Sequence, residues 1–184
     1  EDRSFHTTQW FKEDGDLIGL IGLTMEEFGG SEYLKIIYDR VEGQPPNLDL
    51  RIAQSVNRFC LELIRKNILT SAHDCSEGGL AVAITESCMS HPSVPKGATL
   101  DIDSTIRNDA VLFGESQSRI LISFSAKDRL AVNGMAEAMN VPFSIIGKVG
   151  GDSLVLNING KEFIREDISH LKQLWFGALE TYVG

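Results

Sequence analysis

The stretch Ser71–Leu80, with the sequence Ser-Ala-His-Asp-Cys-Ser-Glu-Gly-Gly-Leu, constrains the fold most, because a polar segment with two successive glycines leads into an apolar-periodic helix over residues 78–89. The first N–H groups of a helix have no intrahelical acceptor and lie at the positive end of the helix dipole, so they attract anions. His73, Asp74 and Ser76 are also costly to bury in an apolar core. We therefore predict that this stretch is a loop that forms a site.

On the residues alone, this loop has a binding interpretation and a structural one. As a binding site it holds a Mg²⁺-nucleotide or a phosphate group, with Asp74 as the metal ligand. The phosphate donors are then the Ser76 hydroxyl and the amides of Gly78 and Gly79, with His73 nearby. As a purely structural element it is a helix cap made by Ser76. The loop matches neither the G-x-x-x-x-G-K-[ST] phosphate loop nor the dinucleotide G-x-G-x-x-G pattern.

Two other chemistries of the loop have less support in the sequence. Cys75 lies two residues from His73, but no third group is evident that would orient a Cys–His nucleophile. His73-Asp74 also resembles the doublet of a metal phosphohydrolase, which needs further His and Asp ligands on helices. The remaining histidines stand in unsuitable contexts, namely His6, His91 and His170.

The composition is that of an ordinary globular chain of 184 residues, with 42% hydrophobic and 23% charged residues. A net charge of −9 and the lack of any Lys/Arg cluster argue against nucleic-acid binding. No apolar run approaches the roughly 20 residues of a membrane span, and the start has no signal-peptide form. The three cysteines, Cys60, Cys75 and Cys88, form no Cys-x-x-Cys pair. We predict a cytoplasmic protein, and the start without Met suggests a piece of a longer polypeptide.

Hydrophobic periodicity predicts the order of the helices and strands. The predicted helices cover residues 31–38 with Ser31 as cap, 49–66, 78–89, a short segment before residue 112, 128–139 and 168–181, and the predicted strands cover residues 16–24, 98–103 and 119–125. Residues 142–149 and 153–158 are predicted to form a hairpin, and Asn159-Gly160 to start a further short strand. This mixture favours an α+β fold in which helices pack on a mixed sheet.

A second polar cluster, Gly114-Glu-Ser-Gln-Ser-Arg119, lies between an apolar segment and a predicted strand. Glu115 and Arg119 frame Ser116 and Gln117 in this cluster. A plain surface loop would also be polar, but the arrangement fits a substrate-binding or interface loop equally well. These four residues are therefore candidate site residues in addition to those of the Ser71–Leu80 loop.

Four motifs together resemble one enzyme family. They are Gly29-Gly-Ser-Glu-Tyr-Leu34, Ser71-Ala-His-Asp-Cys-Ser-Glu-Gly-Gly-Leu-Ala-Val-Ala83, Leu112-Phe-Gly-Glu-Ser-Gln-Ser-Arg119 and Ile146-Gly-Lys-Val149. Their order and spacing are similar to those of phosphoribosylformylglycinamidine synthase, the PurL subunit of the shorter bacterial type. The resemblance covers nearly the whole chain and only the last domain of that subunit. Related enzymes, such as aminoimidazole ribonucleotide synthetase, selenophosphate synthetase and thiamine-monophosphate kinase, carry different residues at the first two motifs.

The resemblance implies a three-layer α/β/α fold with a mixed sheet, like the C-terminal domain of aminoimidazole ribonucleotide synthetase. It assigns residues 1–24 to the end of a preceding domain and residues 25–184 to the C-terminal synthetase-like domain. It also implies a ligase reaction of purine biosynthesis, in which ATP phosphorylates the amide oxygen of formylglycinamide ribonucleotide and ammonia then displaces phosphate. The family's principal catalytic residues lie in earlier domains, so we expect no activity from this chain alone.

The resemblance further implies roles for single residues, cofactors and partners. In the longer form of the enzyme, the segment like Ser71–Leu80 faces a structural nucleotide site, where Asp74 matches a Mg²⁺ ligand and Ser76 a nucleotide contact. Cys75 and Glu77 differ from the residues usual there. Glu115-Ser-Gln117 resembles, through an internal duplication, a substrate-contacting loop of the first half.

The implied cofactors are Mg²⁺ and ATP or ADP, and the implied partners are the remaining domains, the PurQ glutaminase, which supplies the ammonia, and the bridging PurS protein. Apolar surface meant for a neighbouring domain would be exposed in isolation, so we expect the fragment to form a homodimer. Two alternatives stay open, a stand-alone binding or assembly module in which the loop is only a scaffold, and an independent metal phosphohydrolase.

Overall fold

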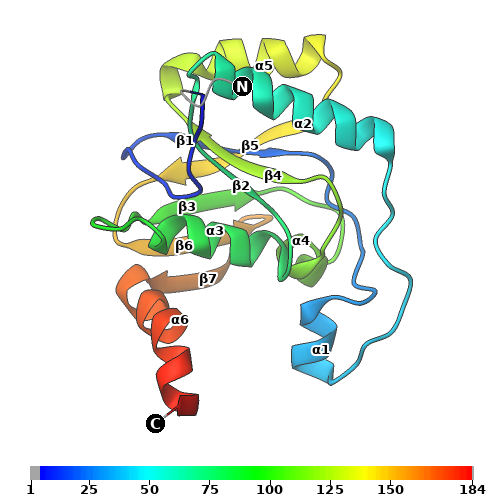
Figure 1. The fold of residues 1–184 in the computed structure, drawn as a ribbon, viewed down its shortest axis with the longest axis vertical. Coiled ribbons are helices and arrows are strands. Elements are labelled where there is room, and N and C mark those ends of the chain that lie inside the picture. The colour runs from blue at the N-terminus through cyan, green and yellow to red at the C-terminus, as the bar shows by residue number, and fades with distance from the viewer. Residues whose placement is uncertain (1–4, 184) are drawn as a thin grey trace.

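A seven-stranded mixed sheet forms the centre of the computed structural model, which describes residues 5–183 (Figure 1). The strands are β1 (Leu17–Ile21), β2 (Leu69–Asp74), β3 (Ala98–Ile102), β4 (Ile120–Phe124), β5 (Phe143–Val149), β6 (Ser153–Ile158) and β7 (Lys161–Asp167). The helices are α1 (Glu32–Tyr38), α2 (Leu50–Arg65), α3 (Gly79–Met89), α4 (Asn108–Phe113), α5 (Arg129–Ala138) and α6 (Ile168–Val183), with a 3₁₀ turn at Ala126–Asp128. The strand order is β2-β4-β1-β5-β3-β6-β7.

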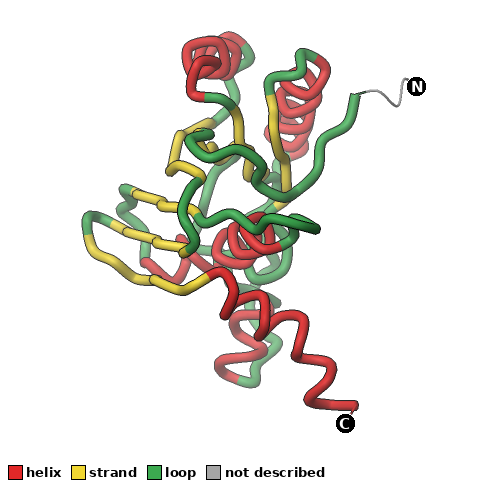
Figure 2. The backbone as a smooth tube through the Cα atoms, turned by 90° about the vertical axis from the view of Figure 1, so that its left-hand side faces the viewer, coloured by secondary structure: helices red, strands yellow, loops and turns green. Residues whose placement is uncertain are grey.

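Helices cover both faces of the sheet (Figure 2). Each face has its own apolar core. On one face, Phe59 of α2 and Val132 of α5 belong to the same core as Ile122. On the other face, Ile84 of α3 belongs to the same core as Leu121. Leu121 and Ile122 are neighbours on β4, and neighbouring strand residues point to opposite faces. The predicted α+β fold with three α/β/α layers and a mixed sheet is confirmed.

The helices predicted from apolar periodicity are confirmed to within two residues at either end. Two of them begin at polar caps, because Ser31 accepts a hydrogen bond from the Leu34 N–H, and Asp49 accepts from Arg51 and Ile52. Among the helices that the structure describes, none combines the length and the apolar character needed to cross a membrane.

β1 lies in the interior of the sheet and pairs antiparallel with β4 on one side and with β5 on the other. Residues 1–24 are predicted to be the end of a preceding domain, and residues 25–184 are predicted to form the C-terminal synthetase-like domain. Of these two segments, residues 1–4 and 184 lie outside the described part of the chain. The pairing joins β1 to the strands that follow it, so a boundary after residue 24 would divide this sheet.

The predicted hairpin of residues 142–149 and 153–158 is wrong, because β3 lies between β5 and β6. β3 pairs antiparallel with β5 and parallel with β6. The turn that joins β5 to β6 therefore passes the start of β3, where the Gly97 N–H donates to the Gly151 carbonyl oxygen at 2.9 Å. The further short strand predicted to start at Asn159-Gly160 is confirmed as β7, which pairs antiparallel with β6.

The stretch predicted as a polar loop over residues 71–80 begins as a strand, which corrects the prediction. Its first four residues belong to β2 and pair with β4, so that Ser71 lies opposite Ser123 and Asp74 opposite Ile120. The hydroxyl groups of Ser71 and Ser123 lie 2.6 Å apart and are buried, so hydrogen bonding replaces apolar contact within the sheet. The periodicity of apolar residues could not reveal a strand whose buried side chains are polar.

The segment Met25–Leu48, which contains α1, extends away from the sheet (Figure 1), and we call it the α1 arm. All described residues of α1 are at least partly exposed. The arm exposes half or more of several large apolar side chains, namely Met25, Ile36, Ile37, Tyr38, Val41 and Leu48. α6 exposes a second apolar group, namely Leu174, Trp175 and Phe176. Contiguous exposed apolar surface is typical of sites that contact another protein surface.

Candidate functional site

A pocket of about 380 Å³ lies where β2 ends and β4 begins, and we call it the β2-end pocket. Five residues predicted for the site line it, namely Asp74, Ser76, Glu115, Gln117 and Arg119. The other lining residues are Asn57, Cys75, Glu77, Ser118 and Ile120. Because Asp74 pairs with Ile120 across β2 and β4, the Ser71–Leu80 stretch and the Gly114–Arg119 cluster meet at one end of the sheet.

Asn57 and Ser118 line the β2-end pocket but are not among the predicted site residues. Asn57 is an exposed residue of α2, directly after the buried Val56, and nothing in the helical pattern distinguishes it from other polar positions. Ser118 has a φ of 60°, a conformation that residues other than glycine adopt uncommonly. The position of Ser118 within the Gly114–Arg119 cluster was the only feature of the sequence that indicated a place at the site.

Asp74 presents an accessible carboxylate at the β2-end pocket, with 72% of its side chain exposed. The Ser76 hydroxyl donates a hydrogen bond to Oδ2 of Asp74. This bond is the main reason that the pKa of Asp74 lies below its usual range, with His73 lowering it further. Asp74 is therefore ionised at neutral pH, as a carboxylate must be to bind a metal ion.

The donor atoms at the β2-end pocket fit a Mg²⁺ ion that also binds phosphate oxygens. Asp74, Ser76 and Gln117 offer oxygen atoms, which Mg²⁺ prefers. Over residues 5–178, no group of three or more His, Cys, Asp or Glu side chains is arranged to hold a metal ion. Mg²⁺ is commonly held by one or two carboxylates together with substrate phosphates and water, which matches the exposed Asp74 carboxylate beside Ser76. A phosphohydrolase centre built from several His and Asp ligands has no support in this geometry.

Glu115 links the three polar motifs of the chain through a single oxygen atom. Its Oε1 accepts hydrogen bonds from the Gly78 N–H at 2.8 Å and from the Glu32 N–H at 3.0 Å. The Gly79 N–H donates to the Ser76 carbonyl oxygen at 3.1 Å. The amides of both glycines thus have acceptors from the protein itself, and the anion at the start of α3 is the Glu115 carboxylate.

Two successive glycines are required at the start of α3 by backbone geometry. Gly78 and Gly79 have φ values of 77° and 67°. A Cβ atom on Gly79 would lie 2.5 Å from the Gly114 carbonyl oxygen. Ser76 does not cap α3, since the N-cap is Gly78 and has no side-chain hydrogen bond. The glycines therefore allow the close approach of the two motifs.

Arg119 and Ser116 hold the Gly114–Arg119 cluster against Thr24 and Met25 of the same chain. The Arg119 side chain is buried, and its guanidinium donates to the carbonyl oxygens of Gly114 and Ser116 and to the Thr24 hydroxyl. Burial lowers the pKa of the Arg119 guanidinium. The Ser116 hydroxyl accepts from the Met25 N–H at 2.9 Å. Gln117 lines the pocket, whereas Ser116 does not.

His73 and Cys75 point towards the α3 side of the sheet. The His73 Nε2 lies 2.8 Å from Oε2 of Glu86 on α3, and 14% of the His73 side chain is exposed. His73 does not line the β2-end pocket. Cys75 belongs to the apolar core that contains α3, and burial raises the pKa of its thiol to about 11. A protonated, buried thiol is not the thiolate that a Cys–His nucleophile requires.

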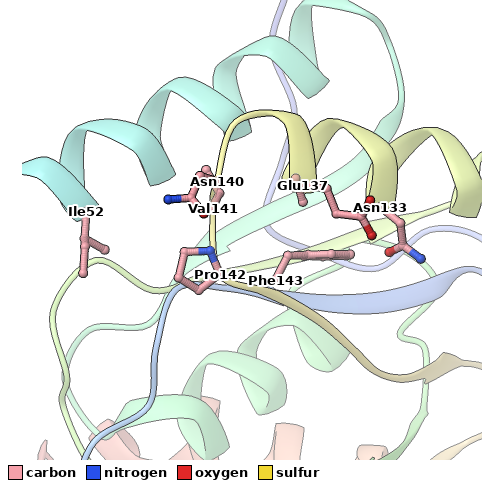
Figure 3. A pocket seen from close by; sticks show the side chains of 8 residues that line it. Ile52, Asn133, Glu137, Asn140, Val141, Pro142 and Phe143 are labelled. Carbon is pink, nitrogen blue, oxygen red and sulfur yellow. The ribbon is translucent and has the colours of Figure 1, made fainter.

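A different pocket, of about 500 Å³, lies between α2 and α5 at the start of β5 (Figure 3). Its eight described lining residues are Ile52, Asn133, Ala136, Glu137, Asn140, Val141, Pro142 and Phe143. Glu137 is the charged residue among these eight, and none of them carries a positive charge. The side chains of these eight residues offer a phosphate group the neutral amides of Asn133 and Asn140 but no cation, and Glu137 would repel it, so a nucleotide phosphate has no charged partner here.

Replacing Glu115 with alanine should lower the free energy of unfolding by about 2 kcal/mol, because two backbone N–H groups lose a charged acceptor. Glu115→Gln should cost less, since its amide oxygen still accepts both bonds. Chemical denaturation of the three proteins measures the difference. Glu137→Ala is the control, because Glu137 is exposed. A Glu115→Ala protein as stable as this control would contradict the structural importance of the two bonds.

A mixed sheet between two helix layers, with a Gly-Gly turn in front of a helix on one face, defines a three-layer α/β/α domain. Residues 13–158 match the family model described as AIR synthase related protein, C-terminal domain. The chain belongs to this family.

Curated relatives carry the name phosphoribosylformylglycinamidine synthase subunit PurL. The relative from Alkaliphilus metalliredigens is 40% identical over 180 residues, which cover 98% of this chain and 24% of the relative. The relative from Moorella thermoacetica is 41% identical over 165 residues, which cover 90% of this chain and 22% of the relative. The chain thus spans about a quarter of the length of these relatives.

Solved structures of Thermotoga maritima PurL share the fold. The complex with FGAR has a TM-score of 0.78 at 16% identity, covering 92% of this chain and 30% of that one. The complex with ATP has a TM-score of 0.71 at 16% identity, covering 92% and 28%. The structure named PurLQS has a TM-score of 0.73 at 13% identity, covering 94% and 28%. At these identities the likeness establishes the fold.

Proposed function

We propose that this chain is the C-terminal part of a cytoplasmic phosphoribosylformylglycinamidine synthase and supplies one wall of a Mg²⁺-nucleotide site. The observation that carries the proposal is the ionised, exposed Asp74 beside Ser76 in the β2-end pocket, in a chain about 40% identical to PurL subunits. The whole enzyme is then an ATP-dependent ligase. It converts formylglycinamide ribonucleotide, ATP and glutamine-derived ammonia to the amidine.

Each residue of the pocket has a role in this proposal. The Asp74 carboxylate holds Mg²⁺, and the Ser76 hydroxyl both orients that carboxylate and contacts the nucleotide. Bound Mg²⁺ neutralises phosphate charge. Glu115 and Gln117 also line the pocket. Arg119 has an indirect role. Its buried guanidinium donates to the Ser116 carbonyl oxygen and so shapes the loop that carries Gln117.

The proposed nucleotide contacts of the glycine amides and of His73 require local rearrangements. Phosphate contact by the amides of Gly78 and Gly79 remains part of the proposal, but it requires Glu115 to release the Gly78 N–H and the Ser76 carbonyl to release the Gly79 N–H. His73 faces Glu86 rather than the pocket, so nucleotide contact by His73 requires a change of side-chain rotamer.

The remaining domains of the same synthase are the proposed occupants of the exposed apolar surface on the α1 arm and α6. PurQ and PurS are the further proposed partners, and the solved structure named PurLQS supports this. When the remaining domains are absent, the same surface is proposed to pair two copies of this chain.

A second candidate function is that of an assembly module without a nucleotide. The contacts of Glu115 and Arg119 favour it, because these polar side chains bond to the chain itself. In this case the three motifs serve as a scaffold for the neighbouring domain. The two candidates differ in whether the β2-end pocket contributes to nucleotide binding.

Calorimetric titration of Mg-ATP into the isolated chain and into the full-length synthase tests the proposal. We expect no measurable binding by the isolated chain, because it supplies one wall of the site and, among its described residues, no group of three or more His, Cys, Asp or Glu side chains that could hold a metal ion. The full-length protein should bind Mg-ATP, and chelation of Mg²⁺ should abolish this binding. Full-length protein whose pocket variants bind nucleotide like the wild type would leave the assembly module as the function.

A further inference from the structure

Glu86, in the interior of α3, forms a row of polar side chains with three residues of the β2 end. The Glu86 Oε2 lies 2.8 Å from Nε2 of His73, and the other ring nitrogen of His73, Nδ1, lies 3.5 Å from Oδ1 of Asp74. The second oxygen of Asp74 accepts from Ser76. The row thus crosses from the helix layer to the pocket and ends on the exposed carboxylate.

We infer that Glu86 is a positioning residue that, through His73, fixes the Asp74 carboxylate for metal binding. This inference rests on the proposed function, because Asp74 is the proposed Mg²⁺ ligand. It adds Glu86 to the site, and it gives His73 a role in orientation rather than in nucleotide contact.

Because the side chains of Glu86 and His73 are both partly buried, the contact between them can fix the orientation of the His73 ring. The Glu86 side chain is 24% exposed and that of His73 is 14% exposed, whereas Asp74 is 72% exposed. A partly buried carboxylate and imidazole need each other as partners, since water reaches them poorly. The contact at Nε2 therefore sets the orientation of the ring, and the ring orientation directs Nδ1 towards Asp74.

An oriented carboxylate binds a metal ion more tightly than a mobile one. Asp74 lies at the last position of β2, where its backbone is fixed by pairing with β4. Its side chain still has two rotatable bonds, and contacts on both oxygens restrict them. Groups that hydrogen-bond to metal ligands typically contribute about 10–100-fold to metal affinity. Glu86 acts one contact further away, so we expect the lower part of this range.

The competing explanation is that Glu86 and His73 only join α3 to β2. Both explanations predict that Glu86→Ala lowers the melting temperature. They differ in the effect of His73→Gln, because the glutamine amide reaches the position of Nε2 and can still bond to Glu86. The variant lacks a group at the position of Nδ1, which faces Asp74. A purely structural role therefore predicts little change in His73→Gln, whereas a positioning role predicts weaker metal binding.

The test measures Mn²⁺ binding in the presence of ADP by electron paramagnetic resonance, on the full-length synthase, together with the melting temperature of each variant. We expect Glu86→Ala and His73→Gln to weaken Mn²⁺ binding about tenfold. Glu86→Gln should restore most of the affinity, since its amide oxygen still accepts from Nε2–H. The matched control is Glu166→Ala, which removes another Glu–His pair, the contact of Glu166 with His170 at 3.3 Å. This control should not change Mn²⁺ binding.

The outcomes separate the inference from the proposed function. If Asp74→Asn weakens Mn²⁺ binding but His73→Gln binds like the wild type, and Glu86→Ala changes only the melting temperature, the positioning role is overturned and the metal site stands. If Asp74→Asn also leaves Mn²⁺ binding unchanged, the proposed metal site itself is overturned. Should Glu86→Ala fail to fold, His73→Gln alone decides between positioning and structure.

Discussion

Replacing Arg119 with methionine should lower the free energy of unfolding by about 3 kcal/mol, because two carbonyl oxygens lose their donors at about 1–3 kcal/mol each. Those oxygens belong to Gly114 and Ser116, and the guanidinium also bonds to the Thr24 hydroxyl. Methionine fills a similar volume and removes the cost of burying a charge, which offsets part of the loss. For a chain of this length the melting temperature should fall by roughly 10 °C, which thermal unfolding measures.

The control for this prediction is Arg129→Met, which removes an exposed arginine from the first turn of α5. Its stability should stay within about 0.5 kcal/mol of the wild type. Arg119→Lys should be nearly as unstable as Arg119→Met, because an ammonium group cannot reach three acceptors with the geometry of a guanidinium. Wild-type stability in Arg119→Met would mean that the Gly114–Arg119 loop is held by its backbone alone.

Replacing Asp74 with asparagine should weaken Mg²⁺-dependent nucleotide retention by the full-length synthase at least about 100-fold, since the change removes the ionised carboxylate that is the proposed Mg²⁺ ligand. The carboxylate has a lowered pKa, so it remains charged at every pH used for such an assay. Asparagine keeps the size of the side chain and can still accept the hydrogen bond from Ser76. Equilibrium dialysis with labelled ADP and Mg²⁺ measures the retention.

Glu77→Gln serves as the control for Asp74→Asn, because Glu77 lines the same pocket and loses the same charge. Its nucleotide retention should remain within about threefold of the wild type, since exposed charges contribute weakly through solvent. Equal losses in both variants would show that the net charge of the pocket matters rather than a ligand bond. Unchanged retention in Asp74→Asn would remove Asp74 from the site.

The helices and the layer arrangement could be predicted because they depend on short-range patterns. The apolar spacing from Ile52 to Ile64 specifies a helix with one buried face, and the structure has α2 at that place. The order of the strands could not be predicted, because pairing is a long-range property. Residues 142–158 have the alternation and turn of a hairpin, and only the presence of β3 between the two strands prevents it.

The polar residues of the site could be predicted, but their contacts could not. Asp74, Ser76, Glu115 and Gln117 were predicted, and they line one pocket because β2 and β4 pair. The bond from Glu115 to the Gly78 N–H joins residues 37 positions apart and depends on the path of both loops. The link from His73 to Glu86 required the packing of α3 on the sheet, which places a helix side chain over a strand side chain.

The insertion of β3 between β5 and β6 has a consequence for biosynthesis of the chain. A nascent polypeptide that ends before residue 153 contains β3 but lacks its parallel partner β6. Its unpaired edge then presents N–H and C=O groups that can join a strand from another molecule. The strands from β1 to β5 can pair before that point, but the open edge of β3 closes only when β6 has left the ribosome, so the sheet is completed late in synthesis.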